Sequence, residues 1–346
     1  MKKFFLLLFA ATIISSCSKT PVGPGGGTVL PKASVVYVVN EGNFGKGNST
    51  LTAYYPDSNK AVTDVFKLVN GRNLGDTGND IAISNGKAYI VVNNSDKVEV
   101  VDPGSVLSLG TIYYKAGTSP YRIAIDPQDN RGFVSDLYTG TVSVINLVTN
   151  TLESDTITVG ANPYGIAYVS GKVFVANSGF GAGRTVSVID AASEKVVRTI
   201  TVGDNPTEIV PDGYGNIWVV CQGNYNPDTP GKIFIVDLNT YTVSDSVYIG
   251  GHPGKIATDQ QQNAAYLIAD SSVIKLSLQS HQIMNRNFIT GSYYGIAVDQ
   301  ATCQIYLTDP KDYVTNGVVY IYSDAGVYTT KMFTAGIIPD AMAFQR

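Results

Sequence analysis

Residues 162–190 read NPYGIAYVSGKVFVANSGFGAGRTVSVID, and this stretch decides the fold. Two apolar segments of alternating character flank a glycine-rich loop, which holds a single aromatic residue, Phe180, near its centre. Alternation with a period of two is typical of β-strands, and clustered Gly and Asn residues are typical of the turns between them. The stretch therefore predicts paired strands joined by a loop that carries a phenylalanine into solvent.

The same pattern recurs along the chain. Segments related to PYGIAYV each place an apolar residue at the same point, and these anchor residues are Ile81, Ile123, Ile166, Ile209, Ile256, Ile296 and Met342. Successive anchors are 40 to 47 residues apart. A repeat of this length, built from short strands, is typical of four-stranded propeller blades, which bury their two faces only by packing against one another.

We therefore predict an all-β fold, a seven-bladed β-propeller with four antiparallel strands in each blade. The chain ends supply a check. The segment before Ile81 contains strand patterns at 35–40, 50–55 and 62–68 but no innermost strand, whereas an apolar strand at 341–344 stands alone at the C-terminus. This C-terminal inner strand is expected to join the N-terminal strands in blade one and so close the ring.

Composition favours binding over acid–base chemistry. Charged residues make up 15% of the 346-residue chain and the formal net charge is -4, so the chain offers no basic surface for a phosphate backbone, and nucleic acid is excluded as an expected partner. There are 22 tyrosines but only 2 histidines. Such a chain is rich in amphipathic aromatic surface and poor in groups that exchange protons near neutral pH.

The N-terminus has the pattern of an export signal. Two lysines precede an apolar run, and the sequence ISSC, ending at Cys17, resembles the bacterial lipobox, in which the cysteine is acylated and becomes the new N-terminus. An ordinary signal with an incidental cysteine is the alternative. We expect a lipoprotein signal peptide at 1–17, a tether rich in Gly and Pro at 18–33, and the propeller at 34–346. The expected location is the outer membrane, with a lipid anchor at Cys17 and the propeller exposed at the cell surface.

One face of the predicted propeller gathers aromatic residues. The loops between the second and third strands of the blades open on the same face as the loops that enter each inner strand. Five of the seven loops between second and third strands contain one central aromatic residue, namely Phe44, Tyr138, Phe180, Tyr225 and Tyr313. Large apolar groups on exposed loops bring no folding benefit, so the set predicts a binding surface.

Two further groups of residues are expected at this face. Ahead of the inner strands lie Asn79, Tyr121, Tyr164 and Tyr294, and beside the aromatic loops lie Asn43, Asn94, Asp136, Asn177 and Arg184. Together they suit a large ligand with flat apolar surface and amide or hydroxyl groups at its edge. The structural alternative is that the tyrosines pack between blades and that the Asn and Asp residues are ordinary turn residues.

Little in the sequence indicates an enzyme. His252 and His281 belong to different parts of the repeat and are not expected to meet, and the sequence has no nucleophile elbow, paired-cysteine motif, zinc motif or phosphate loop. Asp80, Glu208 and Asp340 lie near the predicted axis, where an exported hydrolase or lyase could use them as acid and base. We expect no enzyme, no catalytic residues, no metal site and no cofactor.

The best-preserved unit, FVANSGFGAGRTVSVIDAASEKVVRTITVGDNP at 174–206, resembles the YVTN family of seven-bladed propellers. The N-terminal part, with NEG at 40–42, LGD at 74–76 and NNSDKVEVVD at 93–102, is similar to the surface lipoprotein propellers of gut Bacteroidetes, including those that capture cobalamin beside a TonB-dependent transporter. This resemblance implies that the loop face binds cobalamin or a related corrinoid and passes it to the transporter. A propeller that binds a protein or a glycan, as an adhesion or scaffold module, is the alternative.

Overall fold

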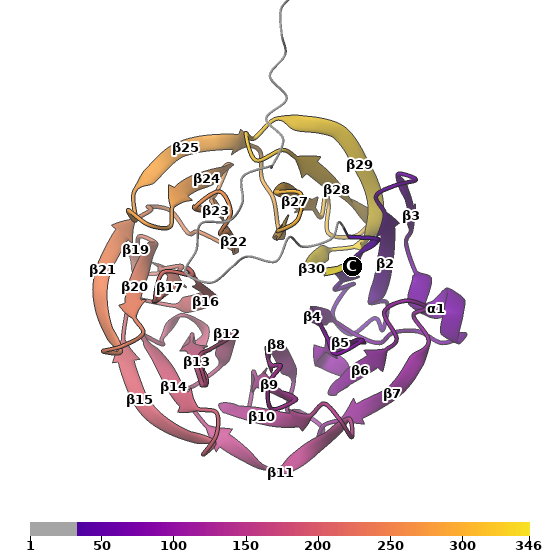
Figure 1. Cartoon of the computed structure of the whole chain (residues 1–346), viewed down its shortest axis with the longest axis horizontal. Coiled ribbons are helices and arrows are strands. Elements are labelled where there is room, and N and C mark those ends of the chain that lie inside the picture. Colours follow the sequence, from indigo (N-terminus) through magenta and orange to yellow (C-terminus); the bar gives the residue numbers. More distant parts are fainter. Residues whose placement is uncertain (1–32) are drawn as a thin grey trace, which may run out of the picture.

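Short, mostly buried strands run through residues 33–346, the part of the chain that this computed structural model describes. They form seven four-stranded antiparallel sheets, which are arranged as blades around a central axis (Figure 1). A small two-stranded hairpin projects from blade five. The predicted all-β, seven-bladed propeller is therefore confirmed.

The strands of each blade are named here from the axis outwards. Blade one contains β30 (Pro339–Gln345), β1 (Val35–Asn40), β2 (Thr50–Tyr55) and β3 (Lys60–Val62). Blade two contains β4 (Gly78–Ser84), β5 (Lys87–Val92), β6 (Lys97–Val101) and β7 (Ser108–Tyr113). Blade three contains β8 (Pro120–Asp126), β9 (Arg131–Asp136), β10 (Thr141–Asn146) and β11 (Thr151–Thr158). Blade four contains β12 (Pro163–Val169), β13 (Lys172–Asn177), β14 (Thr185–Asp190) and β15 (Lys195–Thr201).

The remaining blades follow the same order. Blade five contains β16 (Pro206–Pro211), β17 (Asn216–Cys221), β20 (Lys232–Asp237) and β21 (Thr242–Tyr248), with the hairpin β18 (Asn224–Tyr225) and β19 (Asp228–Thr229) between β17 and β20. Blade six contains β22 (Ile256–Asp259), β23 (Ala264–Ile268), β24 (Ser272–Ser277) and β25 (Ile283–Thr290). Blade seven contains β26 (Ile296–Asp299), β27 (Gln304–Asp309), β28 (Asn316–Tyr322) and β29 (Tyr328–Ile337). Two 3-10 turns, η1 (Asn93–Ser95) and η2 (Gly179–Gly181), interrupt loops of the aromatic face.

Blade one is completed from both ends of the chain, as predicted. Strand β30 pairs antiparallel with β1, with Val36 opposite Phe344 and Val38 opposite Met342. Because β30 also packs against the inner strands β4 and β26, the last strand of the chain links blades seven, one and two. The ring is thus closed by backbone hydrogen bonds between segments some three hundred residues apart in sequence.

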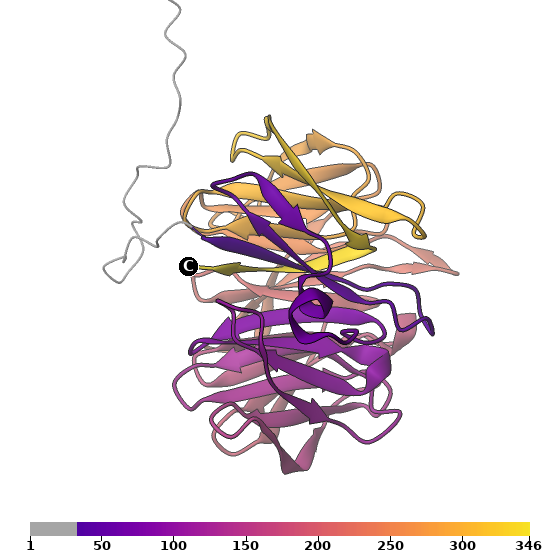
Figure 2. The same ribbon diagram turned by 90° about the vertical axis from the view of Figure 1, so that its right-hand side faces the viewer.

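The predicted strand at 62–68 is only partly correct. Strand β3 ends at Val62, and Val65–Asn70 form the short helix α1 on the outer surface of the ring (Figure 2). The Asp64 carboxylate accepts a hydrogen bond from the Lys67 amide at one end, and Gly71 closes the other end in the left-handed region with φ 67°. Asp before and Gly after a short apolar run are helix-capping residues, and this signal outweighs the strand pattern.

The core is divided among the blade interfaces. Seven clusters of buried apolar side chains are found in the described chain, and each is shared by two neighbouring blades. Tyr54 of blade one, for example, stacks on Phe333 of blade seven with ring centroids 4.2 Å apart. Since every blade is buried only by its neighbours, the loops at the ends of the strands stand on a rigid support.

The predicted signal peptide at 1–17, Cys17 and the predicted tether at 18–33, apart from the buried Ala33, lie outside the described residues. Among residues 33–346, no helix has the length and apolar character needed to cross a membrane.

Candidate functional site

The five loop aromatics predicted for the binding face are exposed in the structure. Their exposed fractions range from 50% for Tyr313 to 75% for Tyr225, and Phe44, Tyr138 and Phe180 lie between these limits. Each belongs to a loop that joins the second and third strands of its blade. Exposed aromatics of this size, repeated at one position of a rigid repeat, are a feature of binding surfaces rather than of packing.

Contacts between neighbouring loops place these aromatics on one face. The Tyr138 and Phe180 rings, from blades three and four, have centroids 6.1 Å apart. Tyr225 of blade five stacks over His252, which precedes blade six, at 3.6 Å. The Asn43 amide, from blade one, donates to the carbonyl oxygen of Tyr313 in blade seven over 2.7 Å. We call the surface formed by the five loops the aromatic rim.

Two rim aromatics adopt a backbone conformation that is unfavourable for bulky residues. Phe180 has φ 51° and ψ 44°, and Tyr313 has φ 62°, so both lie in the left-handed region. Most other residues with positive φ in the described chain are Asn or Gly, which tolerate it. Holding a Phe or Tyr there costs roughly 1–2 kcal/mol, and strain of this kind is concentrated at functional sites.

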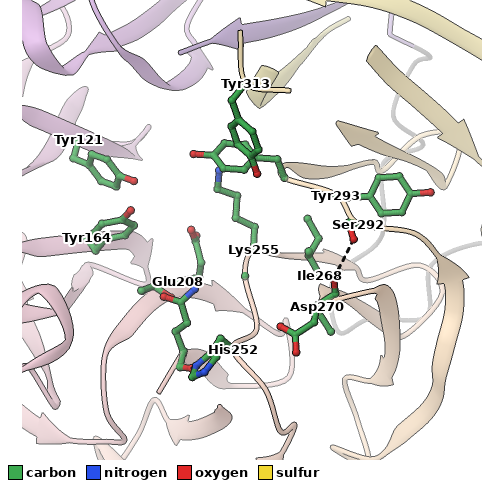
Figure 3. A pocket seen from close by; sticks show the side chains of 15 residues that line it. Tyr121, Tyr164, Glu208, His252, Lys255, Ile268, Asp270, Ser292, Tyr293 and Tyr313 are labelled. Atoms are coloured by element: carbon green, nitrogen blue, oxygen red, sulfur yellow. Dashed lines mark hydrogen bonds between the residues drawn. The ribbon is translucent and has the colours of Figure 1, made fainter. Parts of the chain in front are cut away.

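A cavity of about 350 Å³ opens inside the aromatic rim (Figure 3). Its wall includes four of the predicted tyrosines, Tyr121, Tyr164, Tyr294 and Tyr313. Figure 3 shows Tyr121 and Tyr164 on one side of the cavity and Tyr293 on the other, with Lys255 between them. The volume lies at the lower end of the range for small-molecule sites, so this cavity alone admits only part of a large solute.

The tyrosines of the wall are held by one another and by acids. Tyr121 and Tyr164 have ring centroids 4.2 Å apart, and burial raises the pKa of both phenols. The Tyr294 hydroxyl donates to Oε1 of Glu41 over 2.9 Å, and its ring meets Tyr313 edge to face at 6.0 Å. Burial, followed by the nearby Asp340 carboxylate, raises the pKa of Glu41 to about 7. The wall is therefore a preorganised aromatic surface.

Beneath this cavity, the innermost strands line a second cavity of about 180 Å³, which we call the central channel. Arg122 of blade three lies within 3.5 to 3.9 Å of three carboxylates there, those of Asp80, Glu208 and Asp340. Lys255 of blade six forms a further ion pair with Asp340. Burial raises the pKa of Asp80 and Glu208, whereas Lys255 and Arg122 overcome the effect of burial on Asp340 and lower its pKa.

The channel carboxylates are therefore partners of buried cations, a role that the sequence did not predict. Residues of five different blades meet in this network, which therefore links the blades across the axis of the ring. Glu208 and Lys255 also line the upper cavity, so the network forms its floor.

The predicted polar residues divide into two groups. Asp136 and Asn177 are buried and serve the architecture: Asp136 accepts from the hydroxyls of Thr141 and Ser143, and Asn177 donates to those of Thr185 and Ser187. Burial raises the pKa of Asp136 to about 7. Asn79 is likewise buried, and its backbone carbonyl oxygen accepts a hydrogen bond from the Arg122 guanidinium. These three side chains lie below the surface that a ligand would touch.

The other polar residues lie at the rim. Asn43 links blades one and seven, as described above. Asn94 hydrogen bonds to Asp76, whose carboxylate also accepts from the amides of Gly45 and Gly47 and so fixes the loop of Phe44. Arg184 forms an ion pair with Asp204 at 2.5 Å and remains mostly exposed.

Several cavity residues were missed by sequence reasoning, among them Gln222, His252, Lys255, Asp270 and Tyr293. So was Glu41, which accepts a hydrogen bond from the wall residue Tyr294. His252 and Tyr293 each lie within two residues of a position directly ahead of an inner strand. Their sequence signal is this closeness to positions such as Tyr294, which were predicted to face the ligand. Glu41 and Gln222 lie at the start of loops between second and third strands, where the prediction rested on the aromatic residues and on nearby Asn, Asp and Arg. Lys255 had no sequence signal beyond its place beside an inner strand.

Comparisons with known proteins place the chain by family and by fold. The family model described as "Domain of unknown function (DUF5074)" matches residues 35–333. No curated protein matches the chain.

Solved structures share the architecture. A quinonprotein alcohol dehydrogenase-like protein from Bacteroides thetaiotaomicron is 18% identical, with a TM-score of 0.71 over 91% of this chain and 79% of that one. A functionally unknown protein from Desulfotomaculum acetoxidans is 13% identical, with a TM-score of 0.69 over 91% and 99% of the two chains. A putative 6-phosphogluconolactonase from Bacteroides fragilis is 10% identical, with a TM-score of 0.69 over 90% and 98%. At these identities the likeness shows the fold alone.

Proposed function

Because the chain belongs to the DUF5074 family, whose description names no function, we propose from its site that it is a non-catalytic capture protein. It binds a bulky, flat-faced solute on the aromatic rim. One observation carries this proposal: five exposed aromatics lie on the loops of the face that holds a tyrosine-walled cavity, and two of them adopt a strained backbone conformation.

The aromatic surface is large enough to contribute most of the free energy of binding. If four rings each lose about 100 Å² of exposed apolar area, at roughly 25 cal/mol per Å² the gross gain is about 10 kcal/mol. Association costs on the order of 4–15 kcal/mol, with the lower values applying to preorganised sites. The strands and contacts that hold the rim reduce the ordering cost, and at the lowest cost the rings alone leave about 6 kcal/mol, a dissociation constant of tens of micromolar. Polar contacts and the part of the ligand that enters the cavity add to this.

The ligand that we propose is cobalamin or a related corrinoid. A corrinoid has a broad macrocycle with amide groups at its edge, which matches aromatic rings flanked by Asn43, Gln222 and Asp270. The sequence resemblance to cobalamin-capturing lipoproteins points the same way. In this proposal the chain is anchored in the outer membrane through Cys17, and it delivers the ligand to a TonB-dependent transporter.

The binding proposal is tested by calorimetric titration of the chain with cyanocobalamin. The double variant Phe180→Ala/Tyr225→Ala removes two rim rings, and we expect binding to weaken about 30-fold or more, because each buried anchor ring contributes at least about 1 kcal/mol. The matched control is Tyr55→Ala/Tyr214→Ala, which removes two rings that are 37% and 44% exposed at turns on the opposite face of the ring.

The control variant should bind as the wild type does. Absence of heat with the wild-type protein at micromolar concentration would reject the corrinoid. Equal binding by both double variants would reject the aromatic rim as the site.

The alternative of a protein-binding or glycan-binding propeller predicts a different result. A partner of that kind could use the outer strands, and its binding would survive the loss of Phe180 and Tyr225. An enzymatic role for Asp80, Glu208 and Asp340 is disfavoured, because all three carboxylates already form ion pairs with the buried Arg122, and Asp340 also with Lys255.

A further inference from the structure

His252 occupies a defined position in the cavity wall. It lies in the segment that enters blade six, and its side chain is only 13% exposed. The Tyr225 ring covers one face of the imidazole, with centroids 3.6 Å apart. Figure 3 shows the imidazole at the margin of the cavity, below Glu208. Tyr225 thus blocks one face of the imidazole, and a ligand can reach the ring through its edge.

The hydrogen bond of His252 fixes its tautomer. Nδ1 lies 3.1 Å from the backbone carbonyl oxygen of Gln222. A carbonyl oxygen can only accept, so Nδ1 must carry the hydrogen, and in the neutral ring the lone pair is on Nε2. Nε2 lies 3.6 Å from a carboxylate oxygen of Asp228, beyond hydrogen-bonding distance. Because the Asp228 side chain is 82% exposed, it can move aside without breaking a buried contact.

This arrangement is the one that proteins use to orient metal-binding histidines. Such residues donate through one ring nitrogen to a carbonyl or carboxylate, which leaves the other nitrogen to bind the metal. In the described chain, however, no group of three or more His, Cys, Asp and Glu side chains is placed to hold a bare ion. A single imidazole is a sufficient protein ligand only for a metal that arrives with its other ligands.

We propose that Nε2 of His252 coordinates the metal of the captured solute, which is a planar macrocyclic metal complex with an exchangeable axial position. This inference rests on the proposed capture function and adds to it the class of ligand and the contact that selects it. The imidazole lone pair replaces a weakly held axial ligand such as water, which leaves as a neutral molecule, and the metal keeps its oxidation state. The rim aromatics cover the macrocycle while His252 binds at its centre.

Three probes separate the outcomes. Aquocobalamin has an exchangeable axial water, cyanocobalamin has that position blocked by cyanide, and iron protoporphyrin is a second planar complex with open axial positions. Binding of each is measured by calorimetry, and coordination is measured from the visible absorption spectrum of the probe. Loss of a group that only orients a metal-binding histidine weakens metal affinity about 10- to 100-fold. Loss of the coordinating bond itself, which cyanide prevents, should cost at least as much. We therefore expect aquocobalamin to bind at least about tenfold more tightly than cyanocobalamin.

The test variant is His252→Phe, which retains a flat ring beneath Tyr225 but has no nitrogen. The matched control is His281→Phe, which alters the other histidine, located beside Asp245 and Trp218. With His252→Phe, the spectral change of aquocobalamin should disappear and its affinity should fall to that of cyanocobalamin. His281→Phe should behave as the wild type does.

Failure of this inference differs from failure of the capture function. Equal affinity for the two corrinoids, with no spectral change in the wild type, would overturn the coordination by His252 and leave corrinoid capture intact. A spectral change only with iron protoporphyrin, lost in His252→Phe, would support the inference and replace the corrinoid as ligand. Binding of none of the three probes would overturn both proposals.

Discussion

Replacing Asp136 by Asn should change how the stability of the propeller depends on pH. Asp136 is fully buried at the end of β9, where Ser143 and Thr141 donate hydrogen bonds to it over 2.6 and 2.9 Å. Burial outweighs these two bonds and raises its pKa from 3.8 to about 7. The folded protein therefore binds a proton at Asp136 over a pH range in which the unfolded chain does not.

The direction of the effect follows from proton linkage. A group whose pKa is higher in the folded state stabilises it fully below the unfolded pKa, near 3.8, and this stabilisation is lost as pH rises to about 7. At about 1.4 kcal/mol for each pH unit, the full loss is about 4 kcal/mol, and the part between pH 5 and pH 7 is about 2–3 kcal/mol. Asn keeps an oxygen for the two hydroxyls and has no proton to lose.

The assay is urea unfolding followed by circular dichroism between pH 5 and pH 8. We expect the free energy of unfolding of Asp136→Asn, relative to wild type, to rise by about 2–3 kcal/mol from pH 5 to pH 7 and then to level off. Glu41, whose pKa is also raised to about 7, is present in both proteins and cancels in the difference. The control is Asp155→Asn, at an exposed position on β11, with a difference near zero. A difference for Asp136→Asn that stays constant with pH would refute the reasoning.

Three further changes test the ring and the rim. Ending the chain at Ile338 removes β30 and its pairing with β1. We expect cooperative thermal unfolding to be lost. A melting temperature within a few degrees of wild type would show that closure of the ring is dispensable. Asp340→Ala leaves Arg122 and Lys255 short of a buried partner and should lower stability by about 3–5 kcal/mol, or the melting temperature by about 5–8 °C, measured by calorimetry. Gly183→Ala adds a methyl group that overlaps the carbonyl oxygen of Asn177, so the Phe180 loop must shift, and cyanocobalamin titration should show weaker binding. The control Gly104→Ala, whose added methyl group makes only an ordinary contact, should bind as the wild type does.

The sequence predicted the architecture well because a propeller is specified locally and repeatedly. Each blade needs the same alternation and turns, so seven anchors from Ile81 to Met342 gave seven independent indications of one fold. The exception, helix α1, lies where a capping signal at Asp64 and Gly71 competes with a strand pattern. The positions of the rim aromatics were also predictable, since exposed loops follow directly from the strand order.

What surrounds the cavity was decided only by the tertiary structure. Three contacts illustrate this: Asn177 binds Ser187 of β14, Glu41 accepts from Tyr294, which is 253 residues away, and Arg122 pairs with Asp340. The last two depend on how separate blades approach one another at the axis. Sequence patterns fix the direction of a side chain relative to its own strand, with a period of two. Distances between blades, and the pKa values that burial and neighbouring charges set, arise only when the ring closes.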